Sequence, residues 1–134
     1  MDYYKEIPSS LKLIPGFTRN LMQEISELPF DKERIHDIKL SLDEALVNAA
    51  KHGNKFNPDL SVKISLKSDN SSLVIIVTDQ GKGFDFKNIS DPTKPDNLQN
   101  LSGRGILLIR NHMDKIEFLD GGRSIKMKKF FKGV

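Results

Sequence analysis

The chain lacks cysteine altogether, and its 134 residues contain no long hydrophobic run. Without thiols, a disulfide framework, a thiolate metal site and a cysteine nucleophile are excluded. Because no stretch of 18 apolar residues exists, no membrane-spanning helix is expected. The N-terminus also lacks the basic and then apolar pattern of a signal peptide. At this length one core can bury most of the surface that the unfolded chain exposes, so we expect a single domain, residues 1–134. The lack of cysteine and of a signal-peptide pattern leads us to expect a cytoplasmic location.

Acidic residues are missing from residues 122–134, which hold five of the 21 basic ones. The remainder has 16 basic residues against 18 acidic ones, a net charge of −2, although the whole chain carries +3. Basicity is therefore a feature of the C-terminal segment and not of the whole surface. This distribution, with only Phe130 and Phe131 available there for stacking, argues against direct nucleic-acid binding.

Hydrophobic periodicity predicts a definite order of strands and helices. An edge strand is expected within 5–14, and further strands at 60–67, 73–78, 115–120 and 123–130. Helices are expected at about 15–28, 31–52 and 105–113, with a long functional loop at 79–103. Asp31 is the predicted N-cap of the second helix and Gly53 its left-handed C-terminal cap. Because the strands come as hairpins, we expect an α+β two-layer sandwich: a mixed, mostly antiparallel sheet with helices on one face.

Polar residues recur every three or four positions along the second helix. This spacing places four of them on one face, beside the apolar stripe: Ser41, Glu44, Asn48 and His52. Asn48 offers a neutral oxygen suited to Mg²⁺, and Glu44, one turn earlier, can take a proton from a hydroxyl or a water. Taken alone, Glu44 is better explained as a solvated surface carboxylate, and His52 with Gly53 is well explained as a helix C-terminus.

Two glycine-rich segments complete this pattern. Asp79 follows directly on a buried strand, where its carboxylate can accept hydrogen bonds from a ligand's amine, and Gly81 and Gly83 let the backbone approach a flat ligand. Gly103 and Gly105 begin a helix, which leaves N–H groups free to hold phosphate oxygens. Each segment alone is a weak signal and is often only a turn. Their joint occurrence, in this order and next to these elements, is specific.

These segments together resemble the GHKL ATP-binding superfamily, which includes gyrase, MutL and histidine kinases. Residues 44–53 (EALVNAAKHG) are similar to its N-box, residues 79–84 (DQGKGF) to its G1 box and residues 102–106 (SGRGI) to its G2 box. Within the superfamily, the small size and the form of residues 44–53 resemble the anti-sigma factor serine kinases of bacterial partner-switching systems. The resemblance covers nearly the entire chain and implies the Bergerat-type ATP-binding fold.

The resemblance implies a role for each matching residue. Asn48 would coordinate the Mg²⁺ that bridges the ATP phosphates, and Glu44 would be the general base. Asp79 would accept the adenine amino group in a pocket shaped by Gly81 and Gly83. The other implied parts are an ATP lid at about 84–102, the phosphate-binding residues Gly103, Arg104 and Gly105, and Ser124 near the adenine.

The implied reaction is transfer of the γ-phosphoryl group of ATP to a serine or threonine of a STAS-type anti-anti-sigma protein. The same chain would sequester a sigma factor, with Arg19 on the first helix as a candidate contact. By analogy with the family, a homodimer is a candidate assembly. A membrane partner is not expected. One departure concerns the residue before Ser102, which is often basic in close relatives and is Leu101 here. Arg104 could supply that charge from a nearby position.

Three other functions stay open on the sequence. A nucleotide-gated binding switch would sequester a sigma factor or activate a phosphatase without transferring phosphate; Glu44 favours the kinase, and Leu101 favours the switch. The isolated ATPase half of a histidine kinase is disfavoured because none of the three histidines, His36, His52 and His112, lies in a phospho-accepting helix. A basic nucleic-acid-binding domain is disfavoured by the charge distribution.

Overall fold

The computed structural model describes residues 1–83 and 103–133. The strands are β1 (Asp2–Pro8), β2 (Ser61–Ser68), β3 (Ser72–Thr78), β4 (Lys115–Leu119) and β5 (Ser124–Phe130). The helices are α1 (Ile14–Ile25), α2 (Lys32–Asn48), the π-helical turn η1 (Ala49–Gly53), α4 (Gly103–His112) and the short 3₁₀ turn η3 (Asp120–Gly122). In the described ranges, no helix is long and apolar enough to cross a membrane.

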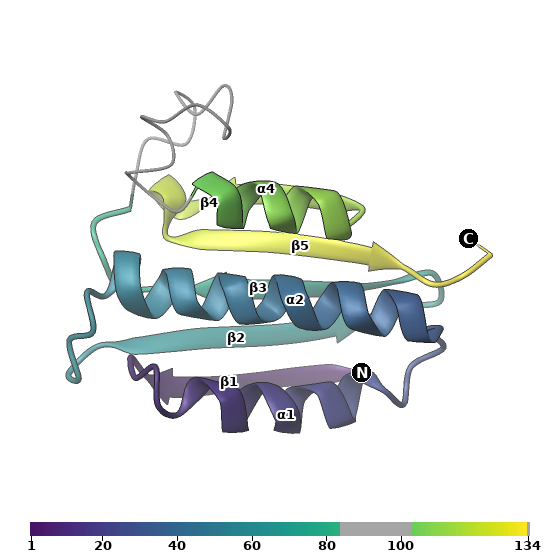
Figure 1. The fold of residues 1–134 in the computed structure, drawn as a ribbon, viewed down its shortest axis with the longest axis horizontal. Coiled ribbons are helices and arrows are strands. Elements are labelled where there is room, and N and C mark those ends of the chain that lie inside the picture. Colours follow the sequence, from purple (N-terminus) through teal and green to yellow (C-terminus); the bar gives the residue numbers. More distant parts are fainter. Residues whose placement is uncertain (84–102, 134) are drawn as a thin grey trace.

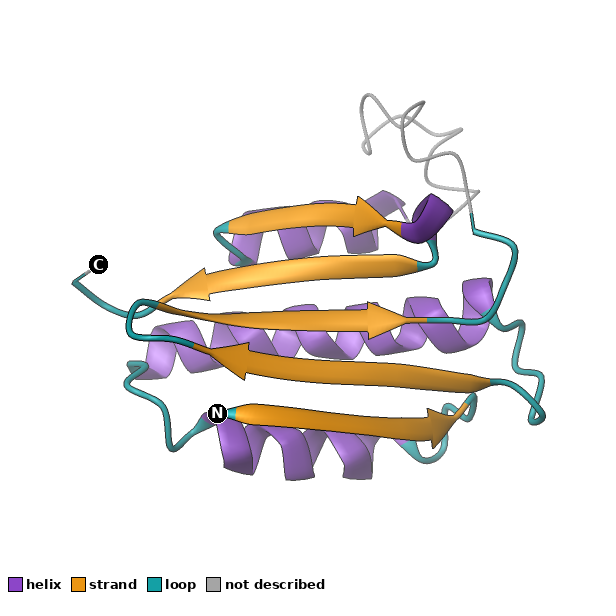
Figure 2. Cartoon of the chain, turned by 180° about the vertical axis from the view of Figure 1, so that it is seen from behind, coloured by secondary structure: helices purple, strands orange, loops and turns teal. Residues whose placement is uncertain are grey.

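The five strands form one sheet in the order β1-β2-β3-β5-β4, and its four pairings are all antiparallel. Figures 1 and 2 show α1, α2 and α4 lying side by side over one face of this sheet, while the other face is open. The expected α+β two-layer sandwich is therefore confirmed. The parallel component expected of a mixed sheet is not found among the described strands.

The core lies between the sheet and the helices. The predicted alternation of buried and exposed side chains along β2 is confirmed. Val62, Ile64 and Leu66 are completely buried, and the residues between them are more exposed. The apolar stripes of α1 and α2 cover them; the largest buried residues of these helices are Leu21, Ile25, Ile38, Leu42 and Leu46. Burying each such side chain contributes about 1.5–3 kcal/mol, which fixes the helices above the sheet.

Local signals placed many element ends closely, but the first helix ends at Ile25, about three residues earlier than expected, and two further ends differ. Asp31 caps α2 as expected: its Oδ1 accepts a hydrogen bond from the Arg34 backbone N–H at 2.9 Å. The edge strand occupies Asp2–Pro8, earlier than expected, and pairs with β2. The left-handed cap at Gly53 is wrong, because positive φ angles occur at Lys55 (52°) and Phe56 (56°) instead. The chain reverses there, after the π-helical turn.

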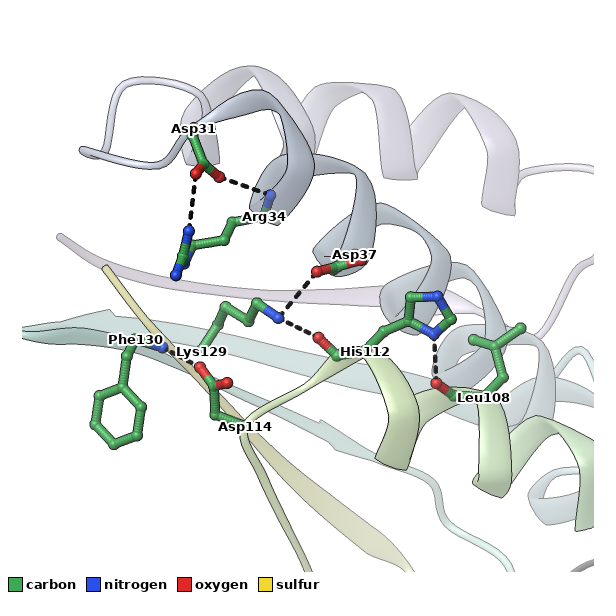
Figure 3. A network of polar contacts seen from close by, with 8 residues as sticks. All are labelled: Asp31, Arg34, Asp37, Leu108, His112, Asp114, Lys129 and Phe130. Carbon is green, nitrogen blue, oxygen red and sulfur yellow. Dashed lines mark hydrogen bonds and ion pairs between the residues drawn. The ribbon is translucent and has the colours of Figure 1, made fainter. Parts of the chain in front are cut away.

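The basic C-terminal segment does not form one surface. Lys129 is 6% exposed, and its Nζ lies 3.1 Å from Oδ2 of Asp37 on α2 while also donating to the carbonyl of His112 at the end of α4. Figure 3 shows these contacts together with the hydrogen bond of 2.7 Å from the Phe130 N–H to Asp114. Lys129 therefore ties β5 to both helices, as a structural cation within the fold.

Candidate functional site

The predicted site residues gather at one end of the molecule. The C-terminal end of α2 with η1, the segment after β3, the first turn of α4 and the turn between β4 and β5 all lie there (Figure 1). The network around Lys129 involves the N-terminal half of α2, so it lies toward the other end of that helix. Segments far apart in the sequence thus converge on the region that the motifs predicted.

Asn48 is the last residue of α2, and its side-chain oxygen is an unusual atom. Oδ1 is buried and has no hydrogen-bond partner within the described part of the chain. A buried acceptor left unpaired costs about 1–3 kcal/mol, so such an atom in a native fold needs a reason. Directly after it the helix widens into a π-helical turn, a local irregularity that is frequent at functional sites.

The chemistry of this oxygen fits a hard cation. Within residues 1–83 and 103–133, no group of three or more His, Cys, Asp or Glu side chains could hold a metal on its own. Mg²⁺ is usually bound by one or two protein oxygens, with phosphates and waters supplying the remaining ligands. A single orphaned amide oxygen at Asn48 therefore suits Mg²⁺ held mainly by a phosphate ligand, and it does not suit a dedicated protein metal cage.

Glu44 lies one helical turn before Asn48 and contacts the start of α4. Its carboxylate packs so closely on the Cα of Gly105 that any side chain there would overlap Oε1. Burial raises the pKa of Glu44, and the neighbouring Asp43 raises it further, while Lys51 opposes the shift. The result is a carboxylate with increased proton affinity, set beside the first turn of α4.

Asp79, Gly53 and Gly81 form an interlocked unit between β3 and η1. The Asp79 carboxylate packs on the Cα of Gly53, and its Oδ1 accepts a hydrogen bond of 2.8 Å from the Gly81 N–H. A methyl group at Gly81 would overlap the carbonyl oxygen of Gly53. Close approach, and not turn conformation, is therefore what requires glycine at positions 53 and 81.

Opposing effects act on the Asp79 carboxyl group. Burial raises its pKa, whereas the Gly81 N–H and the charge of Arg123 lower it and Asp120 raises it again. The raising effects prevail, so this carboxylate is held in a poorly solvated position. A group so placed is suited to bind a ligand's hydrogen-bond donors.

Two contributors to the site were not found from the sequence. Arg123 donates from Nε to the Gly81 carbonyl at 2.8 Å, and its own carbonyl accepts the Asp79 N–H at 2.9 Å. Asn54, which is 2% exposed, accepts the Gln80 N–H at 2.7 Å. In the sequence Arg123 belonged only to a basic run and Asn54 only to a loop. No spacing signal links either residue to positions 79–83.

Ser124 is the first residue of β5 and is paired with Thr78, the last residue of β3. Its hydroxyl lies 2.7 Å from that of Thr78, and Thr78 is directly opposite Lys63 in the sheet. Because strand side chains alternate, Thr78 and Ser124 lie on the face of the sheet opposite to Val77, although Ser124 itself is only 7% exposed. The role of Ser124 near the adenine stays a prediction, while its neighbour Arg123 reaches the loop through the Gly81 carbonyl.

The remaining predicted residues have mixed outcomes. Gly83 has a φ of 76°, and a methyl group there would overlap the Gly121 carbonyl, so it lies against the turn between β4 and β5. Gly103 begins α4 as expected, but the side chain of Arg104 and the lid at 84–102 lie outside the described residues. Arg19 is exposed on α1.

His52 lies in the π-helical turn η1. Burial lowers its pKa, and the positive charges of Lys51 and Lys55 lower it further.

Comparison with known proteins agrees with this geometry. Residues 7–129 match the family model of the histidine kinase-like ATPase domain. A serine-protein kinase RsbW from Staphylococcus epidermidis is 26% identical over 98% of this chain and 88% of its own length. A protein of the same name from Staphylococcus aureus (strain MSSA476) is 26% identical over 94% of this chain and 84% of its own.

A solved structure shares the fold. The RsbU and RsbW domains of Rv1364c from Mycobacterium tuberculosis superpose with a TM-score of 0.62 at 14% identity, over 97% of this chain but 32% of that longer chain. The family match includes β2, β3 and β4 in full, β5 except its last residue, and only the last two residues of β1. It also includes Asn48, Glu44 and the glycine segments described above. This chain belongs to the family of histidine kinase-like ATPase domains.

Proposed function

We propose that residues 1–134 form one ATP-binding domain that acts as a Mg²⁺-dependent protein serine kinase. The observation that carries this proposal is the unpartnered buried oxygen of Asn48, one helical turn from Glu44 with its raised pKa. Phosphoryl transfer depends mainly on positioning and charge stabilisation, for which a metal ligand and a nearby base are the essential parts. The relatives named serine-protein kinase RsbW support the same reaction.

Asn48 would provide the protein's oxygen ligand to Mg²⁺, and the phosphates and waters would supply the others. The bound metal would offset the negative charge of the phosphates during transfer. The first turn of α4, beginning at Gly103, would hold phosphate oxygens through N–H groups that have no partner within the helix. Arg104 would add a positive charge near the same oxygens.

Asp79 would bind the adenine amino group. Its Oδ1 already accepts the Gly81 N–H, which leaves Oδ2 as the carboxylate oxygen with no hydrogen bond among the described residues. Gly81 and Gly83 would form a wall of the adenine pocket without side chains. The segment 84–102 would be the lid over the nucleotide.

Glu44 would act as the general base. It would receive the proton of a serine hydroxyl as that oxygen bonds to the γ-phosphorus of ATP. The bond from the γ-phosphorus to the β–γ bridging oxygen breaks, and ADP leaves with the electron pair. A raised pKa helps this step, because a base with a higher proton affinity accepts the proton more readily.

The proposed protein partners follow from partner-switching regulation. The phosphate acceptor would be a STAS-domain anti-anti-sigma protein, and the chain would also sequester a sigma factor. The exposed Arg19 on α1 is a candidate contact, and a homodimer is a further candidate assembly. Direct binding to nucleic acid is not part of the proposal, because the basic residues are concentrated in the C-terminal segment, and a cytoplasmic location fits such partners.

A second candidate is a nucleotide-gated binding switch without kinase activity. The observation in its favour is that Asn100 and Leu101, both uncharged, precede Ser102. A transferring phosphoryl group is normally stabilised by a cation, so a missing one would reduce transfer more than binding. The same site would then gate sequestration of a sigma factor, or activation of a phosphatase, through ATP occupancy alone.

One experiment separates these candidates. The protein is incubated with Mg²⁺ and γ-labelled ATP together with the STAS protein encoded nearest to it, and Glu44→Gln is run as the matched control. We expect label on the partner with the wild-type protein and none with Glu44→Gln, while both bind nucleotide with affinities within about twofold. Binding without transfer by the wild type would favour the switch, and no nucleotide binding at all would refute both.

A further inference from the structure

We propose that Asn54 is a positioning residue for the nucleotide loop, holding Asp79–Gly81 in the geometry that binds the base. This inference deepens the proposed function and rests on it. Asn54 follows the π-helical turn η1 and is 2% exposed. It belongs to neither of the two boxes on either side of it, but its side chain touches both the sheet and the loop.

Both polar atoms of the Asn54 side chain form hydrogen bonds. Nδ2 donates to the Ser9 hydroxyl at 2.7 Å and to the Ser61 carbonyl at 2.8 Å. Oδ1 accepts the backbone N–H of Gln80 at 2.7 Å. Through this last bond Asn54 fixes the one residue that lies between Asp79 and Gly81.

Gln80 is held from its side chain as well. Its Oε1 accepts the Ser61 N–H at 2.6 Å and the Ser61 hydroxyl at 3.2 Å. Ser61 is thus bonded to both Asn54 and Gln80, which closes a ring of polar contacts at the start of β2. A closed ring leaves the loop few alternative conformations, because moving one member breaks bonds to the others.

The π-helical turn explains how Asn54 reaches this position. The Asn54 N–H donates to the Ala49 carbonyl at 2.9 Å, five residues back, where an α-helix would bond four residues back. Each residue of an α-helix advances the side chain by about 100°, so the extra residue changes the direction of Asn54 by roughly that angle. A regular helix continuing from Asn48 would therefore direct the residue at 54 elsewhere.

The turn also links the two halves of the proposed site. Asn48, the metal ligand, and Asn54, the support of the loop, stand at the two ends of the same short helical turn. Arg123 holds the loop from the opposite side through the Gly81 carbonyl. The loop is consequently organised before any ligand arrives, and a preorganised loop loses less conformational entropy on binding.

The test compares Asn54→Ala with two controls in the full-length protein. Ser9→Ala removes a partner of Nδ2 but leaves the bond to Gln80 intact. Ile38→Val removes one methylene from a fully buried residue, which lies ten positions before Asn48 and so about 15 Å away along the helix. Should Asn54→Ala fail to fold, Asn54→Ser, whose hydroxyl is too short to reach Gln80, tests the same contact.

Two measurements are made on each variant: the Kd for Mg²⁺·ADP by calorimetry well below Tm, and the hydrogen-exchange rate of the Gln80 amide without nucleotide. We expect Asn54→Ala to weaken binding by about tenfold or more and to speed Gln80 exchange by a similar factor, as the loss of a buried hydrogen bond implies. Ser9→Ala and Ile38→Val should lower Tm while leaving both quantities within about twofold of wild type.

The possible failures are distinguishable. Unchanged ADP affinity and Gln80 exchange in Asn54→Ala, with a lower Tm, would overturn the inference and leave Asn54 a purely structural residue. Affinity that falls equally in all three variants would overturn it as well, because binding would then follow stability alone. If the wild type binds no adenine nucleotide, the proposed function fails first, and the exchange measurement still decides whether Asn54 organises the loop.

Discussion

The carboxylate of Glu44 lies directly against Gly105, where any side chain would overlap its Oε1. The two motifs that these residues represent are therefore complementary in space as well as ordered in sequence. Glycine at position 105 lets the carboxylate lie beside the proposed phosphate-binding end of α4. The contact thus joins the proposed base to the proposed phosphate site and supports reading the two motifs as one site.

Gly105→Ala is expected to abolish phosphoryl transfer with little loss of stability. The added methyl group overlaps only the end of the flexible Glu44 side chain, which can rotate away, so the fold should persist. Displacing a general base costs about 10²–10⁴-fold in rate. The transfer rate and Tm are measured side by side, with Gly16→Ala as the stability control, because its methyl would meet only Arg19 at 3.7 Å. Transfer at the wild-type rate would contradict the role of Glu44.

Gly81→Ala is expected to be more damaging, since the overlap is with backbone. The methyl group would collide with the carbonyl of Gly53, which cannot rotate away. Overpacking of this kind costs about 1–3 kcal/mol and shifts the backbone locally. Denaturant unfolding and ADP calorimetry should show both a lower free energy of unfolding and a loss of binding. If Gly81→Ala proved as stable as Gly105→Ala, the interlocked unit with Gly53 would be wrong.

Much of the fold was predictable because its signals are local. The two-residue alternation of β2 and the cap at Asp31 depend on neighbouring residues only, and both are confirmed. The relation between Glu44 and Asn48 follows in the same way from helical spacing. Such patterns establish which residues share a face of a helix or strand. That information was enough to predict that the main motifs lie near one another.

The errors arose where distant segments decide the structure. The π-helical turn after Asn48 has no compositional signature, so Gly53 was assigned a left-handed cap that the chain does not use. Arg123 lies just before β5 and reaches the loop through the Gly81 carbonyl, a contact between segments 42 residues apart that no local pattern encodes. Asn54 meets Gln80 between two loops that are 26 residues apart in the sequence, a contact that no periodicity encodes.

Asn48→Ala is expected to raise, or at least not lower, the Tm of the free protein while removing the Mg²⁺ dependence of binding. The substitution deletes a buried acceptor that has no partner in residues 1–83 and 103–133, and alanine is the better helix former. Calorimetry with ADP in Mg²⁺ and in EDTA measures the effect. In wild type the metal should strengthen binding, and in Asn48→Ala the two affinities should coincide. A metal effect of wild-type size in the variant would remove Asn48 from the site.

Glu44→Gln is expected to raise Tm at neutral pH, with a gain that disappears in acid. Burial raises the pKa of Glu44 in the folded protein, so the fold favours the protonated carboxyl group. The resulting stabilisation is fully present below the ordinary glutamate pKa of 4.5. It is lost as the pH rises through the folded-state pKa. Glutamine keeps the neutral state at every pH. Thermal melts of both proteins from pH 4 to 8 should therefore converge toward low pH, and a Tm difference independent of pH would contradict the shift.

Asp37→Ala is expected to destabilise the fold without touching nucleotide binding. Lys129 has a side chain only 8% exposed and would lose its carboxylate 3.1 Å away, keeping only the His112 carbonyl. Breaking such a buried pair costs about 3 kcal/mol, whereas the double change Asp37→Leu with Lys129→Met replaces it by apolar contact and should cost far less. Urea unfolding of the wild type and the two variants, with ADP affinity as the second readout, makes the comparison.

A loss of less than about 0.5 kcal/mol in the free energy of unfolding of Asp37→Ala would mean that the ion pair behaves like an exposed one. Weakened ADP binding would mean that this end of α2 is coupled to the site at Asn48, contrary to the separation seen in the fold.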